Sequence, residues 1–140
     1  MMSQTSQHHV LIIDHWEHMI GELVALVLQR QRSDCTQVIV GGDKGLQAIQ
    51  EDLPDVVFIY LWAHDPSALD FCQQIRASSR TKHLPVIVWG AKLPSEICPQ
   101  LRDVGATGYL YQPCTPDEIL AARDVALEGG IYFSPDSAYR

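Results

Sequence analysis

The sequence predicts a three-layer α/β fold, a doubly wound parallel sheet with helices on both faces. Short apolar runs rich in valine and isoleucine alternate along the chain with longer segments of helical periodicity. The apolar runs are continuous rather than alternating, which is typical of strands covered on both faces. The chain has 140 residues, the length of one domain, so it can bury a core without a disulfide or a metal.

Five apolar runs are the expected strands. The third and fourth follow Leu-Pro in "DLPDVVFIYLW" and "HLPVIVWGA". Proline disfavours helical geometry in the residue before it, so each Leu-Pro ends a helix and starts a strand. The expected strands are residues 10–14, 37–41, 56–62, 86–90 and 108–111.

Helical periodicity fills the intervals between the strands. In the first interval the apolar residues recur at the spacing of one helix face, namely Ile20, Leu23, Val24, Val27 and Leu28. The expected helices are residues 17–32, 43–52, 67–79, 95–105 and 115–130. Five strands alternating with five helices make a (βα)₅ order, which right-handed crossovers fold into a parallel sheet.

Three helix ends have clear capping residues. Thr115 can cap the last expected helix, Pro116 suits its first position, and Glu118 complements the helix dipole. Gly129 ends this helix, and Gly105 is the expected C-terminal glycine of the preceding helix.

Composition excludes several classes of function. The net charge is −7 and the basic residues are scattered, which argues against a nucleic-acid surface on this chain. Four cysteines lie far apart without a CxxC pair, so they are expected to be free thiols in a reducing compartment. No apolar run approaches the roughly 18 residues of a membrane span, and the polar start MMSQTSQHH is not a signal peptide. We therefore expect a soluble, cytoplasmic protein without membrane contact.

Several segments resemble the receiver domain of two-component response regulators. They are Asp14 at the end of the first strand, "PDVVFIY", "LPVIVWGA" and "GATGYLYQP", and the likeness runs over residues 9–128. The resemblance implies the flavodoxin-like receiver fold, with a five-stranded parallel sheet in the order 2-1-3-4-5. Residues 1–8 are then expected to be a disordered N-terminal segment.

Residues 129–140 are expected to be a tail or linker. "SPDSAYR" has the residues of a helix start, with Ser134 as its N-cap. "ALEGGIYFSP" resembles the exit of receivers that precede a helix-turn-helix of the NarL/LuxR class. Such a domain would lie outside this chain.

The resemblance also implies five site positions. In the family an acidic pair binds Mg²⁺, an aspartate ending the third strand accepts a phosphoryl group from a histidine kinase, and a hydroxyl residue and a lysine follow. Here Asp14 matches the first acid, and His15 stands in the place of the second. Tyr60 occupies the acceptor position, Gly90 replaces the hydroxyl residue and Gln112 replaces the lysine.

These replacements remove the chemistry of the family. A neutral phenol with a pKa near ~10 is a poor nucleophile at pH 7 and a poor ligand for a hard cation. An acyl phosphate would also lack its cationic partner. We interpret the chain as a degenerate receiver, or pseudo-receiver, that is not an enzyme, has no catalytic residue or cofactor, and binds Mg²⁺ weakly or not at all.

An interaction face is expected on the fourth helix, fifth strand and fifth helix, which the family uses for dimerisation and output. Tyr109 matches the aromatic switch position of the family, three residues before the lysine site. The candidates on this face are Ile97, Leu101, Tyr109, Tyr111, Ile119 and Arg123. The alternative for each is an ordinary place in the core.

Three functions remain open from the sequence. The first is a phosphorylation-independent interaction module that docks a protein partner or forms a homodimer in a transcriptional regulator. DNA would be bound only through a further C-terminal domain. The second is a phosphotransfer receiver that uses another acid, Asp65 or Glu17. The third is a metal or small-ligand sensor in the altered pocket, with Asp14, His15 and His64 as candidate metal ligands.

Overall fold

The computed structural model of the chain describes residues 7–15, 19–62 and 67–134. The strands are β1 (His9–Asp14), β2 (Cys35–Val40), β3 (Val56–Leu61), β4 (Val86–Gly90), β5 (Gly108–Tyr111) and β6 (Tyr132–Phe133). The helices are α1 (Met19–Arg32), α2 (Gly42–Glu51), α3 (Ser67–Ala77), α4 (Pro94–Asp103) and α5 (Pro116–Leu127). Among the described residues, no helix has both the length and the apolar character that a membrane span requires.

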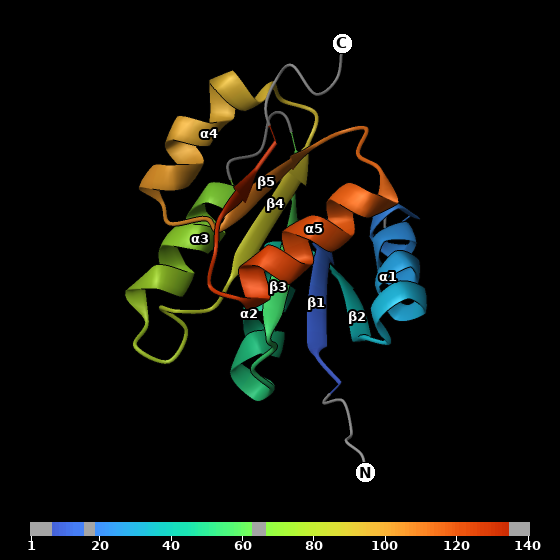
Figure 1. Cartoon of the computed structure of the whole chain (residues 1–140). Helices are drawn as coiled ribbons and strands as arrows, with labels where there is room; N and C mark the ends of the chain where they lie inside the picture. The colour runs from blue at the N-terminus through green and yellow to red at the C-terminus, as the bar shows by residue number, and fades with distance from the viewer. Residues whose placement is uncertain (1–6, 16–18, 63–66, 135–140) are drawn as a thin grey trace.

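The strands form one parallel sheet in the order β2-β1-β3-β4-β5-β6. Helices α1 and α5 cover one face, and α2, α3 and α4 cover the other, so the fold has three layers (Figure 1). The predicted fold class and the order 2-1-3-4-5 are confirmed for the first five strands. The prediction of five strands is wrong by one, because the C-terminal segment adds β6 at the edge of β5.

The core consists of two apolar layers separated by the sheet. Along β1, Leu11 and Ile13 pack on the side of α2, α3 and α4, while Val10 and Ile12 pack on the side of α1 and α5. All four side chains are buried. A strand that is buried on both faces needs apolar residues at every position, which explains the continuous apolar runs.

The buried face of α1 differs from the predicted one. Ile20 and Leu23 were expected to face the core, but both are exposed, and Leu23 is 58% accessible. Val24, Ala25 and Leu28 are buried instead. The sheet side of α1 includes small residues, which let the helix lie close to β1 and β2.

The predicted capping residues of α5 are confirmed. The Thr115 side chain accepts a hydrogen bond from the Glu118 N–H at 3.2 Å, and the Glu118 carboxylate accepts one from the Thr115 N–H at 2.8 Å. This reciprocal pair is a capping box. Gly105 and Gly129 follow α4 and α5 with φ of +81° and +86°, a backbone conformation that favours glycine.

Residues 7–8 and 129–134, the described segments near the two chain ends, make contacts that the sequence does not predict. Residues 7 and 8 were expected to be disordered, but the His8 carbonyl accepts a hydrogen bond from the Cys35 N–H at 2.8 Å. In the expected tail, Tyr132 and Phe133 form β6, so the domain extends beyond residue 128. Residues 1–6 and the body of the expected helix, 135–140, lie outside the described residues.

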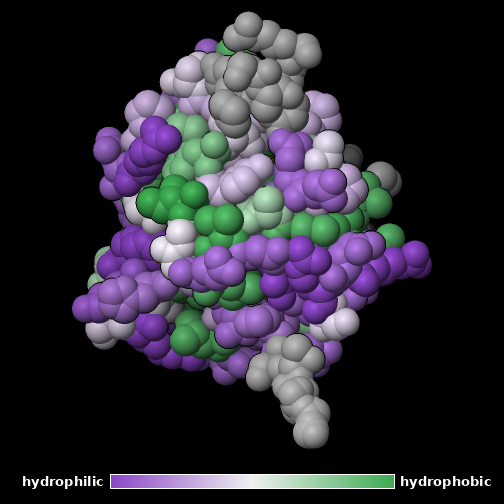
Figure 2. Space-filling view, in the orientation of Figure 1, coloured by the Kyte–Doolittle hydropathy of each residue, from purple (hydrophilic) through white to green (hydrophobic). Residues whose placement is uncertain are grey.

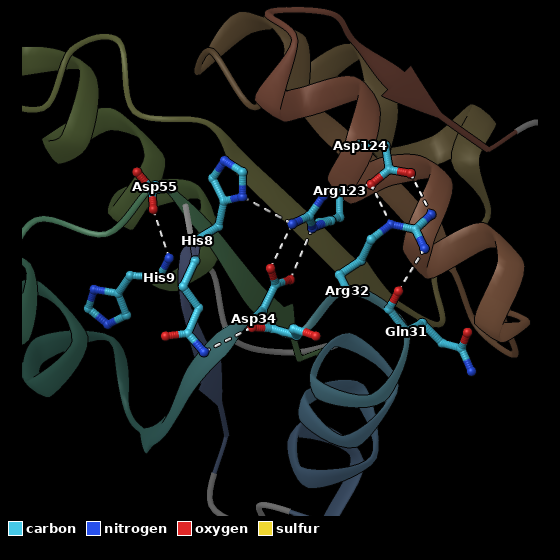
Figure 3. A network of polar contacts seen from close by, with 10 residues as sticks. His8, His9, Gln31, Arg32, Asp34, Asp55, Arg123 and Asp124 are labelled. Atoms are coloured by element: carbon cyan, nitrogen blue, oxygen red, sulfur yellow. Dashed lines mark hydrogen bonds and ion pairs between the residues drawn. The ribbon is translucent and has the colours of Figure 1, made fainter. Parts of the chain in front are cut away.

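A network of ion pairs joins α5 to the end of α1 and the start of β2 (Figure 3). Arg123 donates two hydrogen bonds to the Asp34 carboxylate, at 2.6 and 3.0 Å, and both side chains are buried. Arg123 also donates to Asp124 at 2.8 Å and lies 3.2 Å from Nδ1 of His8. Asp124 accepts two further bonds from Arg32, at 2.6 and 3.0 Å. The network therefore holds α1 and α5 against each other on one face of the sheet.

Asp34→Ala is expected to destabilise the chain by about 3 kcal/mol, because it leaves the Arg123 guanidinium buried without its main partner. Urea unfolding followed by far-UV circular dichroism measures this loss. The control is Asp124→Ala, a more exposed carboxylate that is expected to cost about 1 kcal/mol or less. A loss for Asp34→Ala no greater than that of the control would contradict a structural role for the buried pair.

Acid is expected to weaken the same network at Asp124. Hydrogen bonds from Arg32, with a further contribution from Arg123, hold the pKa of this carboxyl below its ordinary value of 3.8, although partial burial opposes them. The folded chain therefore binds fewer protons here than the unfolded chain. The stability from this group is fully present above pH 3.8 and is lost as pH falls through the lower folded pKa. The unfolding free energies of the wild type and of Asp124→Asn, measured across this pH range, should become more similar as the pH falls. A difference between the two proteins that stays constant with pH would contradict the link between Asp124 protonation and stability.

Candidate functional site

The five site positions meet at the carboxyl edge of the sheet. Asp14 ends β1, Tyr60 is the penultimate residue of β3, and Gly90 ends β4 beside Leu61. Gln112 follows β5, and its N–H donates to the Gly90 carbonyl at 2.8 Å. Because these strands are parallel and adjacent, their last residues lie together, as ligand sites in such folds do.

The Asp14 carboxylate is buried and occupied by backbone hydrogen bonds. Its Oδ2 accepts from the Gly21 N–H in the first turn of α1 at 2.8 Å, and its Oδ1 accepts from the His15 N–H at 2.8 Å. A Cβ on Gly21 would lie 2.9 Å from Oδ2, so the absence of a side chain lets the helix approach. The one remaining acid therefore holds the N-terminus of α1.

Aromatic rings surround the acceptor position. Tyr60 packs against Trp89 with ring centroids 5.4 Å apart, and against Trp62 at 6.2 Å. The His15 ring stacks on Trp62 at 5.1 Å with an interplanar angle of 4°. Both residues that replace acids, His15 and Tyr60, thus belong to one aromatic cluster at the strand ends.

The Tyr60 phenol is unsuited to ionise. Burial raises the pKa of this half-buried phenol, and the negative charge of Asp14 raises it further. A phenol with a raised pKa is protonated at neutral pH, so it offers neither an anionic nucleophile nor a charged metal ligand. The phenol is a packing group in this conformation.

The neighbours of Gly90 explain why a glycine stands at the end of β4. A Cβ on Gly90 would lie 2.9 Å from the Leu61 carbonyl oxygen and 3.4 Å from the Tyr109 hydroxyl. Tyr109 is fully buried, and its hydroxyl donates to the Lys92 carbonyl at 2.7 Å. Gly90 therefore leaves the space in which the inward Tyr109 ring and its hydrogen bond fit.

An open cavity of about 460 Å³ lies beside these residues, between the strand ends, the start of α2 and α3. Asp14, His15 and Tyr60 contribute to its wall. Polar side chains from the helices complete the lining, namely Asp43, Lys44, Ser67, Asp70 and Gln74. The wall combines charges of both signs with apolar groups.

The donor set does not fit the hard cation that the family uses. The five site positions supply one carboxylate, that of Asp14, whose two oxygens already accept backbone hydrogen bonds, together with the imidazole of His15 and the protonated phenol of Tyr60. Within residues 7–15, 19–62 and 67–134, no group of three His, Cys, Asp or Glu side chains could hold a metal ion. His64, Glu17 and Asp65 lie outside the described residues.

The expected interaction face requires correction. Its six candidates were Ile97, Leu101, Tyr109, Tyr111, Ile119 and Arg123. Five of the six side chains are buried, and only Tyr111 is half-buried. Four pack in the apolar layers because their helix or strand turns them toward the sheet, and Arg123 faces Asp34. These side chains cannot form an exposed contact surface in this conformation.

The family of the chain follows from comparison with known proteins. Residues 10–124 match the family model described as the response regulator receiver domain. The chain belongs to this family. The fold, the strand order and the meeting of the five site positions at one edge agree with that assignment.

Several curated relatives of this receiver are named as transcriptional regulators. The DNA-binding dual master transcriptional regulator RpaA of Synechocystis sp. is 31% identical over 80% of this chain and 46% of its own length. The transcriptional regulatory protein BaeR of Escherichia coli is 29% identical over 80% of this chain and 45% of its own length. The chain thus spans less than half the length of these relatives.

Solved structures share the receiver fold. A LuxR-family response regulator from Aurantimonas sp. covers 95% of this chain and 94% of its own, with a TM-score of 0.82 and 19% identity. The chemotaxis response regulator CheY4 of Vibrio cholerae covers 86% of this chain and 99% of its own, with a TM-score of 0.78 and 22% identity. At these identities the likeness establishes the fold alone.

Sequence reasoning missed two contacts that shape the site. The Gly21 N–H donates to the Asp14 carboxylate. The signal in the sequence for this close contact was a glycine inside an expected helix. Ser134 is 2% exposed, and its N–H donates to the Tyr109 carbonyl at 3.0 Å, a contact that the sequence does not predict. The short apolar "IYF" after Gly-Gly was the signal of a strand there.

Gly90→Ala is expected to destabilise this receiver by roughly 1–3 kcal/mol, because the added Cβ meets the Leu61 carbonyl, which is backbone and cannot move aside cheaply. Thermal or urea unfolding measures the change. Gly42→Ala is the matched control, since a Cβ there has nothing within 4 Å. Equal stability of the two variants would show that the space at Gly90 is not required.

Proposed function

We propose that this receiver is a pseudo-receiver, which acts in signal transduction or transcription regulation through phosphorylation-independent protein–protein contact. The observation that carries the proposal is Tyr60. It stands at the acceptor position, half-buried among Trp62 and Trp89, with a raised pKa. A protonated phenol in an aromatic cluster does not perform the carboxylate chemistry of phosphoryl transfer. On this proposal the chain is not an enzyme.

Weak or absent Mg²⁺ binding is part of the same proposal. Both oxygens of Asp14 accept backbone N–H bonds, and His15 stacks on Trp62 where the family has its second acid. A divalent cation at Asp14 would compete with the hydrogen bond that holds the start of α1. The metal and its phosphoryl chemistry are therefore expected to be lost together.

The inward Tyr109 supports a constitutive state. In the family the matching aromatic residue moves as the phosphoryl site fills. Here its hydroxyl bonds to the Lys92 carbonyl, and Gly90 leaves room for this arrangement. We infer that Tyr109 stays inward without phosphorylation.

A role within a transcriptional regulator rests on the relatives. RpaA and BaeR are named as transcriptional regulators, and each is about twice as long as the matched region. The segment "GGIYFSP" resembles the exit of NarL/LuxR-class receivers. We propose that DNA contact, where it occurs, belongs to an output domain, because this chain carries a net charge of −7.

Acetyl phosphate with Mg²⁺, followed by intact-mass measurement, tests the proposal. The native chain is expected to keep its unmodified mass. Trp62 and Trp89 flank the acceptor position, so their fluorescence would report Mg²⁺ bound there. Addition of Mg²⁺ is expected to leave this fluorescence unchanged. A labile, hydroxylamine-sensitive phosphate would overturn the proposal, since it would mean an acyl phosphate on another carboxylate such as Asp65 or Glu17.

Tyr60→Phe is the matched control for this experiment. An acid-stable phosphate that appears on the native chain and disappears in Tyr60→Phe would identify the phenol as an acceptor. That result would also contradict the proposal. Loss of the hydroxyl alone removes this acceptor and keeps the aromatic packing around it.

A ligand sensor is a second candidate, favoured by the cavity of about 460 Å³ beside Asp14 and Tyr60. Its size and mixed lining suit a small polar molecule. A small molecule that raises the melting temperature by mass action, with the rise reduced in Asp70→Ala, would favour this candidate over a purely protein-binding role.

A further inference from the structure

The cavity beside Tyr60 lies at the point where the chain leaves the sheet toward opposite faces. Helix α1 follows β1 and covers one face, whereas α3 follows the neighbouring β3 and covers the other (Figure 1). Ligands of doubly wound sheets bind in the crevice that such a reversal opens. The wall of the cavity includes Asp14 at the end of β1 and Tyr60 near the end of β3, and its volume of about 460 Å³ is in the range of small-molecule sites.

Two helices form the side walls of this cavity. One face of α3 lines it, with residues spaced by three or four positions, namely Ser67, Asp70, Phe71 and Gln74. The opposite wall is the start of α2, with Asp43 and Lys44. Gly41 and Gly42 lie beside them, and a Cβ at either glycine would meet no atom within 4 Å. The wall at α2 therefore leaves open space for a ligand.

Three charged side chains of these walls are unpaired. Asp43 and Lys44 of α2 and Asp70 of α3 form no hydrogen bond or ion pair with any other residue that the structure describes. Asp14 differs from them, because its two carboxylate oxygens accept backbone N–H bonds. The cavity thus offers a ligand two carboxylates and one ammonium group.

We propose that this cavity binds a basic amino acid, a small molecule with two cationic groups and one carboxylate. Its cationic groups pair with Asp43 and Asp70, and its carboxylate pairs with Lys44. A ligand with a single cationic group leaves one wall carboxylate without a partner, which costs binding free energy when water is displaced. The alkyl part of the ligand lies against apolar side chains of the wall, such as Leu46 and Phe71.

Other small ligands match these walls less well. An acidic molecule would place its carboxylates against Asp43 and Asp70, in a chain whose net charge is already −7. A bare divalent cation would lack a sufficient set of ligands, since no group of three His, Cys, Asp or Glu among the described residues could hold a metal ion. The charges therefore favour an organic molecule of net positive charge.

The inference rests on the ligand-sensor candidate and names the class of its ligand. It does not depend on whether any residue is phosphorylated. The cavity lies on the side of α2 and α3, across the sheet from α5. Figure 2 shows the α5 side, where hydrophilic residues of α5 border hydrophobic ones. A ligand in the cavity leaves this surface accessible, so ligand binding and protein contact can occur together.

Isothermal titration calorimetry of the full chain with L-arginine tests the proposal. Agmatine, which is arginine without the carboxylate, and L-glutamate are the comparison compounds. L-Arginine is expected to bind saturably with a Kd of about 1 mM or tighter. Agmatine is expected to bind about tenfold more weakly, because Lys44 then lacks its partner. L-Glutamate is expected to show no binding.

Two variants separate the two kinds of charge on the ligand. Asp70→Asn is expected to weaken L-arginine and agmatine alike, by about tenfold, because both compounds carry the cationic groups. Lys44→Met is expected to weaken L-arginine by about tenfold and agmatine not at all, because agmatine has no carboxylate to lose a partner. Both residues are exposed, so the variants are expected to fold as the wild type does.

Glu51→Gln is the matched control. Glu51 is an exposed acid at the end of α2, outside the cavity lining. Its replacement lowers the net negative charge by the same amount as Asp70→Asn. The control is expected to keep the wild-type affinity for both L-arginine and agmatine.

Four outcomes would overturn the proposal. L-Arginine could give no saturable binding up to about 10 mM, or L-glutamate could bind as tightly as L-arginine. Glu51→Gln could weaken L-arginine as much as Asp70→Asn does, which would mean attraction by net charge alone. Lys44→Met could weaken agmatine as much as L-arginine.

Failure of this inference is distinguishable from failure of the proposed function. If L-arginine does not bind but another small molecule raises the melting temperature in a way that depends on Asp70, the ligand class is wrong and ligand sensing stands. If L-arginine binds as expected but acetyl phosphate forms an acyl phosphate, the phosphorylation-independent role is wrong and the cavity still has its ligand.

Discussion

A parallel sheet covered on both faces is the constraint on which the rest of this structure depends. Strands β1, β3 and β4 are buried on either side, so their side chains are apolar at nearly every position. Parallel strands also bring their carboxyl ends to one edge. Asp14, Tyr60 and Gly90 therefore lie together, whatever chemistry their side chains retain. A substitution at this edge consequently affects several neighbouring strands.

At that edge, the residues at the site positions make contacts within the chain itself. Both carboxylate oxygens of Asp14 accept hydrogen bonds from backbone N–H groups at or just before the start of α1. The Tyr60 ring packs against the rings of Trp62 and Trp89. Burial of a phenol is favourable and keeps it protonated, whereas burial of clustered carboxylates is costly without a cation. The buried phenol of Tyr60 therefore needs no cation beside it.

The side of α4, β5 and α5 is closed by different means. Its apolar side chains lie in the core, the Arg123 guanidinium pairs with Asp34 on the opposite side of α5, and the outer edge of β5 carries β6. A partner at this side would meet β6 and the polar surface of the helices. The docked strand β6, rather than the side chains predicted from the sequence, therefore forms the outer edge of the sheet on this side.

The sequence by itself determined the layer architecture, the order of the elements and the ends of α4 and α5. These follow from local rules, namely continuous apolar runs, Leu-Pro starts, the capping box at Thr115 and the glycines after each helix. The resemblance to receiver domains implied the five site positions, and they lie together because strand ends in a parallel sheet converge. The exposed Leu23 shows the limit of periodicity, since several rotations of α1 satisfy the same spacing.

Only the tertiary structure decided which of these residues touch. The pairing of Arg123 with Asp34 joins residues 89 positions apart, and the contact of Gly21 with Asp14 depends on how closely α1 approaches the sheet. Likewise, β6 is too short to be stable alone and exists because the β5 edge and Gly108 accept it. Long-range contacts of this kind leave no local periodicity in a sequence, since their energy appears only when separate elements pack together.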